Sequence, residues 1–154
     1  MENPLSADPL SRPQVLSNVS RRLADMHAAG YVHRDLKPAN VMWLPRQNRW
    51  TLIDFGCVAR VGEDAPVSFT LAFAAPEVAA ACRAGRKSIQ ATPALDAWSL
   101  GVMALELLTG AAAYDLLACG RKKVCNQRNA CEPLVGALIV GRAYVAPHAS
   151  RAHV

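Results

Sequence analysis

Apolar residues recur at helical spacing along three parts of the chain, 14–29, 76–83 and 95–108. In the first part the opposite face is polar, which predicts an amphipathic helix that packs one side against a core and ends at Gly30. Residues 95–108 are apolar almost all round, so we expect a central helix that is buried on every side. The apolar face of the first helix comprises Leu16, Val19, Leu23 and Met26.

Two short apolar runs, 41–44 and 50–53, flank the polar stretch Pro-Arg-Gln-Asn-Arg and predict a β-hairpin. Such a hairpin places Asn40, before its first strand, and Asp54, after its second strand, at the same end of one small sheet. Both side chains would then reach one metal ion. The predicted fold is therefore mainly α with a small β-hairpin.

Four other stretches show no sustained period. Residues 1–13 carry three prolines and predict a flexible, extended lead-in. Residues 57–74 predict a loop, and the basic, polar stretch 84–92 predicts a surface connection. Residues 111–154 contain no repeat, clear period or known motif, so we leave this tail unassigned.

The length and the net charge of the chain limit its possible functions. A chain of 154 residues supplies one domain with a single hydrophobic core. Its net charge of +5 favours anionic partners such as nucleotide phosphates or acidic surfaces. A charge of this size is also typical of an ordinary solubilising surface. The charge alone says nothing about nucleic acid, and we expect no nucleic-acid partner.

Cysteine usage and the ends of the chain indicate the compartment. Five cysteines are an odd number, which cannot pair completely within one chain. No signal peptide follows Met1, and the apolar run 133–140 is too short to cross a bilayer. We therefore expect an intracellular protein, cytoplasmic or nuclear, that does not bind membranes.

The candidate chemistry lies in two short strings, YVHRDLKPANVM at 31–42 and LIDFG at 52–56. They place three oxygen-bearing side chains and one lysine at fixed spacing. Phosphoryl transfer from a metal-bound nucleotide needs such a set: a carboxylate base, a cation at the moving phosphoryl group, and an amide with a second carboxylate as Mg²⁺ ligands. The four side chains are Asp35, Lys37, Asn40 and Asp54.

Five landmarks in order resemble the catalytic, carboxy-terminal lobe of the eukaryotic-type serine/threonine protein kinases. After the first helix come H-R-D-L-K-P-A-N at 33–40 and D-F-G at 54–56. An A-P-E string at 75–77 ends the activation segment, and D-A-W-S-L-G at 96–101 opens the apolar helix. The resemblance covers residues 14–110, so we interpret the chain as a partial kinase domain, truncated at both ends.

The resemblance implies a role for each matching residue. Asp35 would be the catalytic base and Lys37 the partner of the γ-phosphate of ATP, and lysine at this position is typical of serine/threonine-specific kinases. Asn40 and Asp54 would bind Mg²⁺. Two apolar residues would line the adenine side of the nucleotide site, Met42 and Ile53.

The resemblance also implies regulation. An arginine beside the base, here Arg34, is typical of kinases whose activation segment is ordered by phosphorylation. Thr70 stands seven residues before Glu77, where the family's threonine contacts the base and the lysine, so Ser68 is the better phosphate acceptor. Asp96 would anchor the backbone of the catalytic loop.

The function that follows is transfer of the ATP γ-phosphoryl group to a serine or threonine hydroxyl of a protein substrate. The 154 residues contain neither a G-x-G-x-x-G loop nor a V-A-I-K-like strand, which the family uses to hold the phosphates. We therefore expect the isolated chain to be inactive unless a partner supplies or replaces the amino-terminal lobe. The alternative is a non-catalytic binding module, a pseudokinase-like scaffold.

Overall fold

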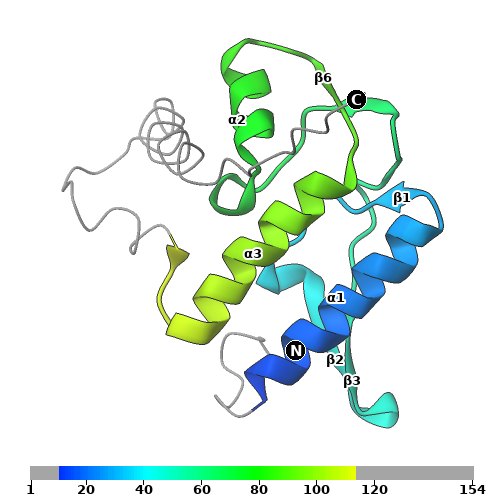
Figure 1. Cartoon of the computed structure of the whole chain (residues 1–154), viewed down its shortest axis with the longest axis vertical. Helices are drawn as coiled ribbons and strands as arrows, with labels where there is room; N and C mark the ends of the chain where they lie inside the picture. The colour runs from blue at the N-terminus through cyan, green and yellow to red at the C-terminus, as the bar shows by residue number, and fades with distance from the viewer. Residues whose placement is uncertain (1–10, 114–154) are drawn as a thin grey trace, which may run out of the picture. The chain divides into compact units, whose positions relative to one another are not determined.

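Three helices and three two-stranded antiparallel sheets make up residues 11–113, the part of the chain that the computed structural model describes (Figure 1). Most of the predicted lead-in and tail, residues 1–10 and 114–154, lie outside the described residues. The helices are α1 (Arg12–Ala28), α2 (Pro76–Arg83) and α3 (Pro93–Thr109). The strands are β1 (Tyr31–Val32), β2 (Val41–Leu44), β3 (Arg49–Leu52), β4 (Ala59–Arg60), β5 (Asp64–Pro66) and β6 (Ser88–Gln90).

Helix α1 confirms the predicted first helix but begins two residues earlier. Pro13 lies in its first turn, where a missing N–H costs no hydrogen bond, so the last two residues of the predicted lead-in are helical. Its buried residues form one row at four-residue spacing, Val15, Val19 and Leu23. The helix ends before Gly30, which has a φ of +83° and thus adopts the left-handed conformation that glycine allows.

The predicted hairpin is confirmed as β2 and β3, which pair with Val41 opposite Leu52. Its turn passes through Asn48 in the left-handed region. Trp50 and Leu52 alternate with more exposed residues along β3, and both are buried in the cluster that α1 and α3 share. The hairpin is thereby fixed to both long helices.

Two predicted connections contain strands. The predicted loop 57–74 includes β4 and β5, and the predicted surface connection 84–92 includes β6. β4 pairs with β1, and β5 pairs with β6. Strands of two or three residues are too short to show a period of two, so the pattern predicted a loop at 57–74 and a surface connection at 84–92 and missed these strands.

Helix α3 also differs from its prediction. Met103 and Leu107 are fully buried, each with a gain of about 1.5–3 kcal/mol over an exposed side chain. Leu105 and Leu108, by contrast, are 39% and 64% exposed, so the helix is not buried on every side. Gly110, with a φ of +71°, ends the helix, and its N–H donates to the Glu106 carbonyl.

Helices α1 and α3 share the largest buried cluster, and the hairpin and the catalytic-loop residue Leu36 complete it. The N-terminal turn of α1 also contacts the C-terminal turn of α3, where the Arg12 guanidinium donates to the Leu107 carbonyl (2.8 Å). None of the helices in the described part of the chain combines the length and the apolar character needed to cross a membrane.

Candidate functional site

The catalytic loop, residues 33–40, presents Asp35 at the centre of a hydrogen-bonded cluster. The Lys37 ammonium lies 2.6 Å from Asp35 Oδ2 and donates to the Thr70 hydroxyl at 2.9 Å. That hydroxyl donates to Asp35 Oδ1 at 2.7 Å. Asn40 donates its side-chain N–H groups to the backbone oxygen of Asp35 (2.8 Å) and to Oδ2 (3.3 Å). Three side chains from two distant segments, Lys37, Asn40 and Thr70, therefore hold one carboxylate in place.

The cluster keeps Asp35 ionised. Partial burial by itself raises the pKa of Asp35, but hydrogen bonds from Lys37 and Thr70, the charge of Lys37 and the Asn40 amide together outweigh it. The pKa of Asp35 is therefore lowered from its ordinary value of 3.8. At neutral pH the side chain is a carboxylate that can accept a proton.

The hairpin places Asp54 beside Asn40 along the backbone. The Ile53 N–H donates to the Asn40 carbonyl at 2.9 Å, extending the β2–β3 ladder by one pair, and Asp54 follows directly. Asp54 is exposed, has a φ of +61°, and accepts one hydrogen bond from the Gly56 N–H at 3.3 Å. Its carboxylate thus remains open toward solvent.

Asp96, fully buried on α3, fixes the backbone of the catalytic loop. Its two carboxylate oxygens accept the N–H groups of His33 and Arg34, both at 2.8 Å. The anchoring contact predicted for Asp96 is therefore confirmed. Arg34 has a φ of +70°, an uncommon conformation for a residue with a side chain, and these bonds hold it there.

Arg34 binds backbone oxygens of the activation segment, residues 57–77. Its guanidinium donates to the carbonyls of Cys57 (3.0 Å) and Pro66. Its Nε is buried without a hydrogen-bond partner. Ser68, the predicted phosphate acceptor, is exposed nearby, with its hydroxyl 3.4 Å from the Cys57 thiol.

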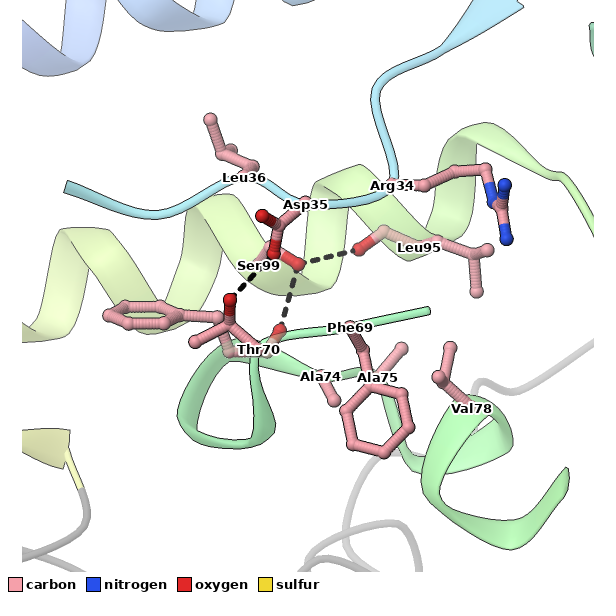
Figure 2. Close-up of a pocket in the computed structure, with 11 residues that line it drawn as sticks. Arg34, Asp35, Leu36, Phe69, Thr70, Ala74, Ala75, Val78, Leu95 and Ser99 are labelled. Atoms are coloured by element: carbon pink, nitrogen blue, oxygen red, sulfur yellow. Dashed lines mark hydrogen bonds between the residues drawn. The ribbon is translucent and has the colours of Figure 1, made fainter. Parts of the chain in front are cut away.

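A small cavity lies between the catalytic loop, the activation segment and helices α2 and α3. Figure 2 shows Asp35 on the catalytic loop joined to Thr70 by a hydrogen bond, with Phe69 and Val78 below. The volume of the cavity is about 10 Å³, enough for one water molecule. The lining residues are Arg34, Asp35, Leu36, Phe69, Thr70, Phe73, Ala74, Ala75, Val78, Leu95 and Ser99.

The predicted adenine-side residues lie on the hairpin, away from this cavity. Met42 is half-buried on β2 opposite Thr51, and Ile53 is half-buried just after β3. Neither residue lines the cavity beside Asp35. Their predicted role at the adenine stays a prediction.

Two residues that help to position the site, His27 and Ser99, were not predicted from the sequence. His27 Nε2 lies 2.8 Å from Asp96 Oδ2, and the Ser99 hydroxyl lies 2.8 Å from the Phe73 carbonyl oxygen. A signal for His27 was present, because it continues the four-residue spacing of the buried row on α1. Ser99 also carried a signal, because it is the serine of the D-A-W-S-L-G string at 96–101, although no role was assigned to it.

Comparisons with known proteins agree with this geometry. A family model described as "Protein kinase domain" matches residues 5–133. The serine/threonine-protein kinase Kist of Mus musculus is 39% identical over 98 residues, which cover 60% of this chain and 23% of that protein. Serine/threonine-protein kinase F of Synechocystis sp. is 36% identical over 118 residues, 70% of this chain and 22% of that protein.

A further relative shows the same partial coverage. Serine/threonine-protein kinase SBK1 of Mus musculus is 42% identical over 88 residues, 55% of this chain and 20% of that protein. The chain therefore spans less than a quarter of the length of these curated relatives.

Proposed function

This chain belongs to the protein kinase family, and we propose that it carries the catalytic centre of a serine/threonine protein kinase. The proposed reaction transfers the γ-phosphoryl group of ATP to a serine or threonine hydroxyl of a protein. The observation that supports it best is the cluster around Asp35, in which a carboxylate, an ammonium and a hydroxyl lie within 2.6–2.9 Å of one another.

Each member of the cluster has a defined task in this reaction. Asp35, an ionised carboxylate, would orient the acceptor hydroxyl and take its proton. Lys37 would place a positive charge at the transferred phosphoryl group, where negative charge must be neutralised. Thr70 would hold both side chains at their present spacing, so the geometry needs little rearrangement.

The residues present fit a magnesium ion with its nucleotide. Mg²⁺ takes oxygen ligands and keeps several waters, and one or two protein oxygens are enough beside the phosphates. Asp54 offers an exposed carboxylate. The hydrogen bonds of Asn40 use only its Nδ2, so its amide oxygen would be the atom that binds the metal. Bound Mg²⁺ would neutralise the phosphate charge, while Met42 and Ile53 would contact the adenine.

We further propose that residues 14–110 correspond to the carboxy-terminal lobe of the kinase domain. The order of the three helices, the hairpin and the loop that carries Asp35 supports this assignment. The loop and lysine that hold the α- and β-phosphates in this family are not among the 154 residues. We therefore expect the 154-residue polypeptide alone to be nearly inactive, because positioning supplies most of this catalysis.

Ser68 is the proposed regulatory phosphate acceptor. It is exposed, and it lies within the segment that Arg34 binds. A phosphate at Ser68 would give the Arg34 guanidinium, whose Nε has no partner, an anion to pair with. Replacement of Ser68 by alanine should then abolish any activation produced by an upstream kinase.

The test of the proposed function is transfer of labelled phosphate from γ-labelled ATP by the protein at its natural length. We expect phosphoserine or phosphothreonine in an acceptor peptide library and a loss of about 10²–10⁴-fold in Asp35→Asn. Equal activity in Asp35→Asn would contradict the proposal. An inactive protein whose melting temperature is unmoved by millimolar Mg·ATP would instead favour the non-catalytic binding module.

A further inference from the structure

Strand β6 gives the activation segment a second attachment, separate from its contacts with the catalytic loop. It pairs with β5 in antiparallel register, with Ile89 opposite Ala65 and Ser88 opposite Pro66. Ala65 is buried in a small cluster with β1 and β4, so β5 is also covered on one face. In Figure 1 the segment that carries β6 runs from the end of α2 to the start of α3.

The backbone hydrogen bonds extend beyond the strands. The Ala91 N–H donates to the Glu63 carbonyl at 2.8 Å, and the Val67 N–H donates to the Lys87 carbonyl at 3.0 Å. These bonds alternate along the pair, so Ser88 and Pro66 face each other at a position without a ladder bond. A proline fits there, and the Pro66 carbonyl is left for Arg34.

The side chain of Ile89 contacts the site indirectly, through a buried cluster. It packs against the buried cluster of Ala74, Ala75, Val78 and Leu95. Phe69 packs against the same cluster and lines the cavity beside Asp35. The next residue along the chain is Thr70, which donates to Asp35.

We propose that Ile89 is a positioning residue for the activation segment, which it holds so that Phe69 and Thr70 stay in place beside Asp35. Its backbone fixes β5 and its side chain supports the cluster under Phe69. The proposal rests on the proposed kinase function for its consequence on activity. Its structural part, the order of residues 63–70, stands independently of that function.

The side-chain test compares Ile89→Ala with Ile89→Val in the protein at its natural length. Thr70 should lose its fixed position in Ile89→Ala, so we expect kcat to fall by about tenfold, with the KM for ATP within about twofold. Valine keeps most of the packing, so Ile89→Val should retain the wild-type kcat. A fall in kcat no larger than the fall in the fraction of folded protein, measured by circular dichroism, would overturn the proposal.

The backbone test compares Ile89→Pro with Ser88→Pro. Proline at 89 removes the N–H of a paired residue, whereas proline at 88 faces Pro66 at the unpaired position. Amide hydrogen exchange should therefore speed up at 63–67 by about tenfold or more in Ile89→Pro and stay near wild type in Ser88→Pro.

The two proposals fail in different ways. If the wild-type protein transfers no phosphate, the proposed function fails, and the exchange rates at 63–70 still decide the role of Ile89. If the wild-type protein is active but Ile89→Ala and Ile89→Pro leave both kcat and exchange unchanged, the proposal for Ile89 is overturned. Faster exchange at 63–70 in both variants, with wild-type exchange in the two control variants, supports it.

Discussion

Asp35 and Asp54 are the two carboxylates of the proposed site, and their surroundings are opposite. The Asp35 side chain is 13% exposed and is held by Lys37, Thr70 and Asn40. Asp54 is exposed, sits in a left-handed conformation and accepts one long hydrogen bond. The difference supports a site in which the protein itself assembles the half that would handle the proton, whereas the half that would handle the metal is left open for a ligand.

This contrast follows from charge. A carboxylate that has lost water must be compensated by donors within the protein, and Asp35 is compensated by a lysine and a hydroxyl. A metal ligand must keep free lone pairs, because a carboxylate already occupied by protein donors binds Mg²⁺ less well. The exposure of Asp54 therefore agrees with its proposed role, and substitutions at the two positions should have different consequences.

The largest expected effect is on phosphate transfer in Asp54→Asn. Loss of one negative ligand should lower the rate by about 10³-fold. The melting temperature of the ligand-free protein should stay within about 1 °C, since this exposed side chain accepts one long bond. Transfer assays and thermal unfolding check both statements, and a large fall in melting temperature would show that Asp54 is structural.

Asp96→Asn should release the backbone of the catalytic loop, which carries Asp35, from helix α3. The buried carboxylate accepts two backbone N–H groups and contacts His27, and an amide cannot accept all three. We expect a loss of about 2–4 kcal/mol in the free energy of unfolding, measured by urea denaturation. Asp64→Asn, at an exposed position, is the matched control and should change stability by less than about 0.5 kcal/mol.

Thr70→Val should remove the hydroxyl that links Asp35 and Lys37 without removing a charge. Valine has the shape of threonine but neither donates to Asp35 nor accepts from Lys37. Transfer should fall by about tenfold, and Thr70→Ser, which keeps the hydroxyl, should retain most of the rate. Equal rates in the valine and serine variants would show that the hydroxyl has no role.

The smallest expected effect is the pH dependence of stability. The pKa of Asp35 is lowered from 3.8, since its hydrogen bonds outweigh partial burial, so its ionised form stabilises the folded state. This contribution is fully present above pH 3.8 and is lost as the pH falls below it. Urea denaturation of the wild type and of Asp35→Asn should show the wild type losing more stability on acidification. An equal loss of stability in the two proteins would contradict this prediction.

Long elements and spaced motifs were predictable from the sequence. The amphipathic row of α1, the short helix α2 and the β2–β3 hairpin each carry a local pattern, and the structure contains all three. The contact of Thr70 with Asp35 and Lys37 was expected from the family resemblance and is present. The roles proposed for these residues remain predictions.

Features that depend on distant pairing were not predictable. Strands β4, β5 and β6 are two or three residues long, and their partners lie up to about thirty residues away. The exposure of Leu105 and Leu108 depends on what packs against α3, which an apolar sequence does not reveal. The Arg34 bonds to the Cys57 and Pro66 carbonyls likewise depend on the path of the activation segment.

The most direct test of the contrast between the two carboxylates is the affinity for Mg·ATP, measured by isothermal titration calorimetry on the protein at its natural length. We expect the Kd of Asp35→Asn to stay within about threefold of wild type, because the role proposed for Asp35 is to take the acceptor proton. Asp54→Asn should bind Mg·ATP at least about tenfold more weakly, because it would lose the proposed carboxylate ligand of the metal. Equal losses in the two variants, or unchanged binding in Asp54→Asn, would contradict the account.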